Sequence, residues 1–79
     1  MSDLAGPFDA VDIEEALREG DKLITLRDDT ALTCRSTYRV DKVIPSNVNV
    51  RVDQSLVWDL DSLDWVVIDP LDVIAIDDA

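Results

Sequence analysis

The sequence contains no histidine, one cysteine and only two glycines among its 79 residues. Histidine is the side chain that most often serves as a general base near neutral pH, and without it Cys34 has no imidazole to activate it as a nucleophile. A zinc site needs several His or Cys ligands, and a phosphate-binding loop needs more glycines than Gly6 and Gly20 supply. We therefore expect a protein that is not an enzyme and that binds no cofactor and no metal.

Basic residues are also few, and their distribution is uneven. Seven Lys and Arg face 18 Asp and Glu, so the net charge is −11. Residues 1–20 hold six acids and one base, residues 21–51 hold four acids and six bases, and residues 52–79 hold eight aspartates and no base. A molecule of this charge repels phosphates at long range, so we expect no direct binding of nucleic acid.

The chain has no apolar run long enough to cross a bilayer, and its first residues lack the basic and apolar regions of a signal peptide. We expect no membrane partner and a cytoplasmic location, in the host cytoplasm if the protein is viral. An apolar content of 47%, rich in Val, Ile and Leu, favours a folded chain over disorder. Residues 1–8 are assigned to a flexible N-terminal arm, and residues 9–79 to a single small β-rich domain.

Residues 10–19 carry the signals of a short helix. Asp9 is a good N-cap, and Asp12 at the third helical position can bind the free amides of the first turn. Phe8 and Ile13 have the spacing of a hydrophobic staple across the helix start. Gly20 is a suitable residue to end the helix.

Alternating apolar and polar residues predict strands in the rest of the chain. These strands are expected at 22–27, at 32–40 with a bend near Ser36, at 48–53, at 65–68 and at 71–76. The connections are too short for helical crossovers between parallel strands, so the sheet should be mainly antiparallel. The fold class is thus mainly β (α+β), with an SH3-like small barrel as the first choice. The alternative is an open antiparallel sheet that carries one packed helix.

Residues 57–66, VWDLDSLDWV, are nearly a mirror image of themselves. As a hairpin with its turn at Asp61-Ser62, they pair like with like: Leu60 with Leu63, Asp59 with Asp64, and Trp58 with Trp65. That arrangement opposes two carboxylates, which is unfavourable by some tenths of a kcal/mol. The competing interpretation is a short helix capped by Ser55. The sequence favours a helical turn or a hairpin tip over a long regular helix.

The acidic C-terminal third suggests a function in binding. Acids beside aromatic side chains suit a partner with a basic surface, because charge steers the encounter and an aromatic anchor adds affinity. In size and charge alone, the chain resembles the small acidic inhibitors of phages, which substitute for nucleic-acid phosphates on DNA- or RNA-binding proteins. The candidate partner-binding residues are Trp58, Asp59, Asp61, Asp64, Trp65, Asp69 and Asp72.

The rival interpretation is a structural or assembly subunit that forms a homo-oligomer through an exposed sheet edge. Its acidity would then serve solubility or a high-salt host. A further face, built from Arg35, Arg39 and Arg51, is the next candidate if the acidic stretch is not the interface. We expect these arginines to pair with the aspartates of residues 53–78.

Overall fold

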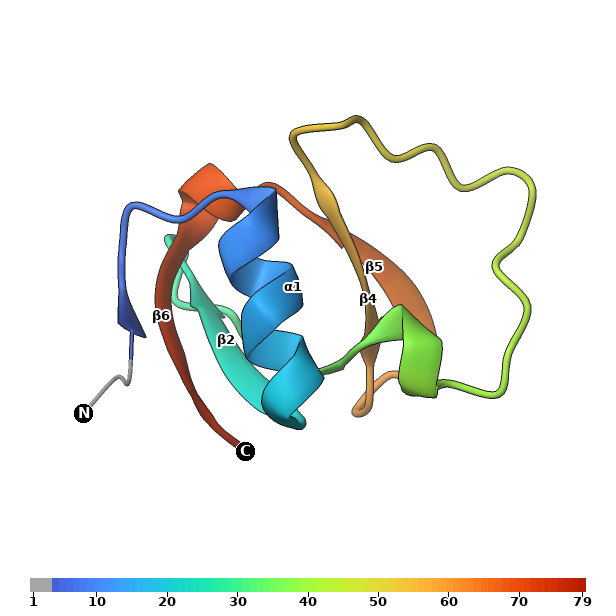
Figure 1. Cartoon of the computed structure of the whole chain (residues 1–79), viewed down its shortest axis with the longest axis horizontal. Coiled ribbons are helices and arrows are strands. Elements are labelled where there is room, and N and C mark those ends of the chain that lie inside the picture. Colours follow the sequence, from blue (N-terminus) through green and yellow to red (C-terminus); the bar gives the residue numbers. More distant parts are fainter. Residues whose placement is uncertain (1–3) are drawn as a thin grey trace.

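The computed structural model describes residues 4–79, with side chains described from Gly6 onward. It contains one α-helix and a six-stranded antiparallel sheet with the strand order β1-β6-β2-β3-β4-β5 (Figure 1). In chain order the elements are β1 (Leu4–Ala5), α1 (Ala10–Glu19), β2 (Lys22–Leu26), β3 (Ala31–Arg35), the 3₁₀ turn η1 (Thr37–Arg39), β4 (Ser55–Asp59), β5 (Asp64–Ile68), the 3₁₀ turn η2 (Pro70–Asp72) and β6 (Val73–Asp78).

The mainly β fold with one helix, expected from the sequence, is confirmed. The sheet does not close into a barrel, because β1 and β5 are its two edges and do not pair with each other. The open antiparallel sheet with one packed helix is therefore the architecture of the chain. None of the helices among the described residues has the length and apolar content needed to cross a membrane.

The helix begins where its capping signals predict. The Asp9 carboxylate accepts the Asp12 N–H at 2.9 Å, and the Asp12 carboxylate accepts the Asp9 N–H at 3.0 Å, which completes a capping box. Gly20 ends the helix with a φ of 153°, a backbone conformation that residues with a side chain rarely adopt. The predicted helix at 10–19 is confirmed.

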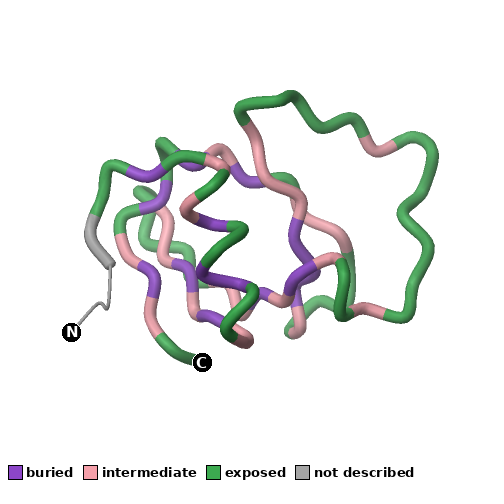
Figure 2. Tube along the Cα trace, in the orientation of Figure 1, coloured by how far each residue is buried: buried purple, intermediate pink, exposed green. Residues whose placement is uncertain are grey.

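The core lies between α1 and the face of the sheet that the helix covers (Figures 1 and 2). In the central strands, Ile24 of β2 stands opposite Ile76 of β6, and both are fully buried. Burial of such apolar side chains is the main source of stability. The buried cluster consists of Phe8, Ile13, Ala16, Leu17, Ile24, Cys34, Val57, Ile68, Val73 and Ile76.

The strand expected at 32–40 ends earlier than the alternation predicts. The Ser36 hydroxyl accepts the Tyr38 N–H at 3.3 Å and caps η1, so the chain leaves the sheet after Arg35. The bend expected near Ser36 is thus a strand end. Tyr38, which the pattern placed in a strand, lies in η1 and is largely exposed.

The strand expected at 48–53 is absent, and this prediction was wrong. Residues 40–54 form one long loop, which arcs away from the sheet and is mostly exposed (Figures 1 and 2). A turn at 51–54, in which the Gln54 N–H donates to the Arg51 carbonyl at 3.0 Å, takes up local backbone groups. Alternation fits a chain to a sheet, but a strand also needs a neighbour, and β3 and β4 already pair with each other.

The ends of the chain lie together at one side of the sheet. Within the stretch that the sequence assigns to a flexible arm, residues 1–3 lie outside the described residues, Leu4–Ala5 pair with β6, and Phe8 is buried. At the other end, the strand expected at 71–76 begins at Val73. The Asp69 carboxylate accepts the Leu71 N–H at 3.1 Å and caps η2 before β6 starts.

Candidate functional site

Strands β4 and β5 form a hairpin, so the mirror-like stretch 57–66 folds back on itself. The register pairs Trp58 with Trp65 and Asp59 with Asp64, as the hairpin interpretation predicts. The two indole rings meet edge to face, with centroids 4.9 Å apart and an interplanar angle of 75°. Such a contact between aromatic rings stabilises by about 0.5–1.5 kcal/mol beyond the area it buries.

The turn of this hairpin is built around Asp59. Its carboxylate accepts the Asp61 N–H at 3.1 Å and the Ser62 hydroxyl at 2.7 Å. The Leu63 N–H donates to the Asp59 carbonyl at 2.9 Å, and Leu63 adopts a positive φ of 55° in place of a pairing with Leu60. Asp59 is only 5% exposed, so it is a structural residue of the turn.

Asp64, which stands opposite Asp59, uses its carboxylate differently. Its Oδ1 accepts the Trp65 N–H at 2.8 Å, on the edge of β5 that faces away from β4. The two opposed carboxylates are thus each occupied by a separate set of local donors. This explains how the hairpin tolerates like charges at paired positions.

The structure places the predicted aspartates in different parts of the β4–β5 hairpin and of η2. Asp61 and Asp64 are exposed at the hairpin tip. Asp69 caps η2, at the opposite end of β5 from the tip. Asp72, in the same turn, lies 4.0 Å from the Arg27 guanidinium. A single acidic face made of all the predicted aspartates does not form.

The two tryptophans differ in their availability to a partner. Both lie on the sheet face opposite to Val57 and the helix, because neighbouring residues of a strand alternate. Trp58 is nevertheless only 8% exposed, whereas Trp65 is half-buried. Leu63 at the tip is 67% exposed. The sequence did not single out Leu63, because its exposure depends on the left-handed turn conformation.

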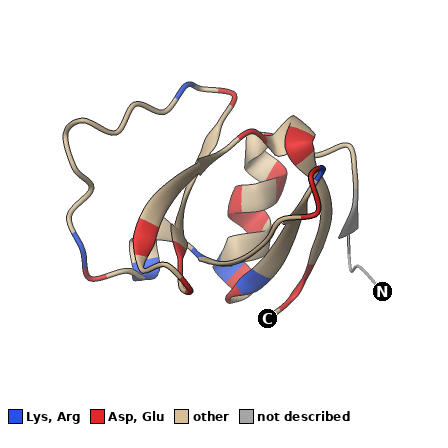
Figure 3. Ribbon diagram, turned by 180° about the vertical axis from the view of Figure 1, so that it is seen from behind, with Lys and Arg blue, Asp and Glu red and all other residues tan. Residues whose placement is uncertain are grey.

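The basic residues of the described chain are mostly neutralised locally. The Arg35 guanidinium donates two hydrogen bonds, of 3.0 and 2.8 Å, to the Asp21 carboxylate. Arg39 donates to the same carboxylate at 3.4 Å. The hydrogen bond from Arg35 lowers the pKa of Asp21 below its ordinary value. The expected pairing of these two arginines with residues 53–78 was therefore wrong, whereas Arg51 does pair with Asp53 at 3.3 Å. Figure 3 shows both basic segments of the long loop beside acidic ones.

No shared arginine face forms on neighbouring strands. Arg35 lies on β3, Arg39 lies in η1, and Arg51 lies in the long loop. The loop places Arg51 away from the sheet, because the strand expected there is absent.

Cys34 is a core residue. Its side chain is fully buried and stands opposite Asp59 in the register of β3 and β4. Burial, with smaller contributions from the charges of Asp59 and Asp61, raises the pKa of the Cys34 thiol to about 12. The thiol is therefore protonated at neutral pH and a poor nucleophile.

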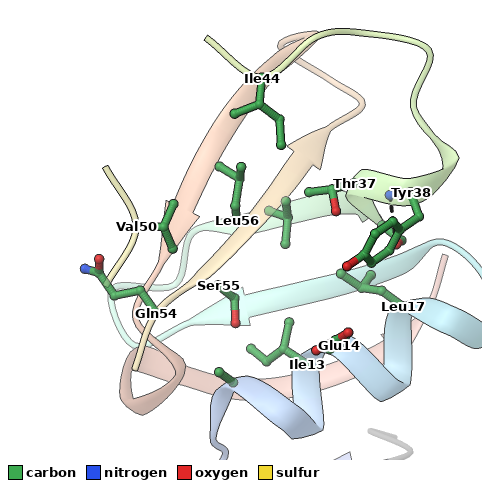
Figure 4. Close-up of a pocket in the computed structure, with 13 residues that line it drawn as sticks. Ile13, Glu14, Leu17, Thr37, Tyr38, Ile44, Val50, Gln54, Ser55 and Leu56 are labelled. Carbon is green, nitrogen blue, oxygen red and sulfur yellow. Dashed lines mark hydrogen bonds between the residues drawn. The ribbon is translucent and has the colours of Figure 1, made fainter. Parts of the chain in front are cut away.

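A hollow of about 310 Å³ lies between α1, η1, β4 and the long loop (Figure 4). Ile44 and Val50 of the loop approach Leu56 of β4 on one side, and Leu17 of the helix lies beside Tyr38 on the other. The sequence does not indicate this hollow, because the alternation at 48–53 predicts a strand of the sheet there. Its lining is mainly apolar, and Glu14, Gln54 and Ser55 supply polar groups.

The fold and this site define a small acidic protein with one helix on an open antiparallel sheet. No family model, no curated protein and no solved structure matches this chain.

Proposed function

We propose that the protein is a non-enzymatic binding module that engages a basic partner protein through the tip of the β4–β5 hairpin. One observation carries the proposal. Asp61 and Asp64 are exposed at the tip, and neither takes part in an ion pair among residues 4–79. Carboxylates that no cation of the described residues neutralises are available to a partner.

The tip also offers apolar surface beside its charge. Leu63 is exposed and lies between Asp61 and Asp64 in the sequence. The half-buried Trp65 directly follows Asp64. Exposed carboxylates speed the encounter with a basic surface, and a nearby apolar contact slows dissociation. Trp58 packs edge to face against Trp65. Trp58 is not itself the anchor, because it is buried.

The proposed partner is a DNA- or RNA-handling protein whose basic groove normally receives phosphates. Carboxylates presented on a rigid hairpin can occupy such a groove, and the module would then act as an inhibitor or regulator. The high negative charge supports this choice, because long-range attraction to a basic groove needs a net charge of opposite sign.

The proposal is tested by capture from a host lysate with three immobilised baits. The first is the unmodified protein, and the second carries Asp61→Asn with Asp64→Asn. The third carries Glu15→Gln with Asp29→Asn, which removes the same charge from exposed positions on α1 and the β2–β3 turn. We expect the first and third baits to retain a basic protein that added DNA displaces.

The second bait should lose most of that protein. Equal retention on all three baits would show that the hairpin tip is not the binding site. A captured protein that DNA does not displace would contradict the proposed substitution for phosphates.

A further inference from the structure

The long loop contains a strand sequence that has no strand partner. Val48, Val50 and Val52 alternate with Asn49 and Arg51, a pattern typical of a half-buried strand. Val52 is 99% exposed, and Val50 is also exposed. Exposing β-branched side chains in this way costs free energy that pairing would recover.

Strand β5 lies at the edge of the sheet. This strand pairs only with β4 in the part of the chain that the structure describes. Its outer edge carries Trp65 and Val67, and Val67 is 38% exposed although it lies in a strand. Unpaired edges readily accept another strand.

The backbone groups on both segments point the right way for pairing. The Trp65 N–H bonds the Asp64 carboxylate. This bond points to an outward-facing amide at Trp65 and, by alternation, at Val67. In the loop, the N–H and carbonyl of Arg51 are both bonded to Gln54. In the extended conformation that pairing requires, alternation places the N–H and carbonyl of Val50 on the opposite side.

We propose that residues 48–51 of a second copy of this chain add to β5 as an antiparallel strand. One register matches the side chains and the backbone: Val48 opposite Val67, Asn49 opposite Val66, Val50 opposite Trp65 and Arg51 opposite Asp64. The valines then cover the exposed apolar side chains of β5. Arg51, which pairs with Asp53 in its own loop, also meets Asp64, whose carboxylate takes part in no ion pair among the described residues.

In this register the Val50 N–H donates to the Trp65 carbonyl. The Trp65 N–H donates to the Val50 carbonyl once it leaves the Asp64 carboxylate, which then turns to Arg51. The Val48 carbonyl supplies a third, to the N–H of Val67. The Val48 N–H is already bonded to the Pro45 carbonyl at 3.1 Å, and it takes no part in the pairing. The bonds from Arg51 to Gln54 lie on the other side of the added strand and are retained.

The added strand must come from another copy. Ser55 pairs with Ile68, so Asp64 lies four residues, or about 13 Å, further along β5. A strand outside β5 lies two strand spacings, or about 10 Å, from β4. Arg51 beside its own Asp64 would therefore be about 16 Å from Ser55, whereas the four residue steps from 51 to 55 span at most about 14 Å.

In the proposed assembly the loop of each copy lies on β5 of the other. The same surface is then used twice, and the product is a two-fold dimer. The inference comes from the chain's own loop and edge, and it does not depend on the basic partner proposed above. Because both use Asp64, the partner and the second copy are expected to compete.

The test is a charge exchange followed by sedimentation equilibrium at low salt, from micromolar to millimolar protein. Arg51→Asp and Asp64→Arg, each alone, oppose like charges at both sites of the dimer, and each should weaken self-association about tenfold or more. An equimolar mixture of the two variants restores an opposite-charge pair at both sites. The mixture should therefore form a heterodimer with nearly the affinity of the unmodified protein.

Matched controls change the same charge outside the register. Lys42→Asp lies in the same loop and Asp29→Arg lies in the β2–β3 turn, and both should leave self-association unchanged. Amide hydrogen exchange gives a readout without substitutions: the exchange of the Val67 N–H should slow as the protein concentration rises. An unmodified protein that stays monomeric at millimolar concentration would overturn the inference, and so would a mixture no heavier than its separate components.

Discussion

At the scale of single residues, the aspartates of the hairpin differ in role although their sequence surroundings are alike. Asp59 is buried and holds the turn with two hydrogen bonds, while Asp61, two residues later, is exposed. The sequence predicted both as members of one acidic face. It could not separate them, because burial of Asp59 depends on its place opposite Cys34 in the sheet.

Replacing Asp59 should destabilise the fold. Asp59→Ala leaves the Asp61 N–H and the Ser62 hydroxyl without their acceptor, at a cost of about 1–3 kcal/mol in the free energy of unfolding. Asp61→Ala, the matched control, removes an exposed carboxylate and should change it by about 0.5 kcal/mol or less. Urea denaturation of both variants gives the comparison. Equal effects of the two substitutions would show that Asp59 does not hold the turn.

At the scale of elements, the sequence predicts what local chemistry determines. The helix at 10–19 needs only its own caps and its apolar stripe, and the structure has it with those bounds. The pairing of Trp58 with Trp65 follows from the symmetry of its stretch. The prediction of a strand at 48–53 was wrong, because an alternating pattern does not indicate whether a neighbouring strand is available for pairing. The continuation of the strand at 32–40 beyond Ser36 was also wrong, because one hydrogen bond to the Ser36 side chain ends β3.

The helix cap provides a test at this scale. Asp9→Ala removes the acceptor of the Asp12 N–H and should lower the free energy of unfolding by about 0.5–2 kcal/mol. Glu15→Ala, on the exposed side of the same helix, should be within about 0.5 kcal/mol of the unmodified protein. Guanidinium denaturation followed by circular dichroism measures both. A midpoint unchanged by Asp9→Ala would mean that the helix does not need this cap.

At the scale of the whole molecule, the fold sorts the charges that the sequence only counts. Arg35 and Arg39 neutralise Asp21, and Lys22, although buried, binds Glu19 and Asp78. Other exposed acids, such as Glu15 and Asp29, take part in no ion pair within the described residues, and neither do Asp61 and Asp64. Asp61 and Asp64 differ from these acids in lying together at the tip of the β4–β5 hairpin, beside Leu63 and Trp65. That location is the basis of the proposed binding function.

The most direct measurement of this claim is the association rate with the captured partner at two salt concentrations. The Debye length falls from about 10 Å at 0.1 M to about 3 Å at 1 M, so steering by the tip should weaken strongly with salt. Asp61→Asn with Asp64→Asn should slow association at low salt and flatten its salt dependence. Glu15→Gln with Asp29→Asn should change both much less. Identical rates and salt slopes for the two double variants would contradict the account.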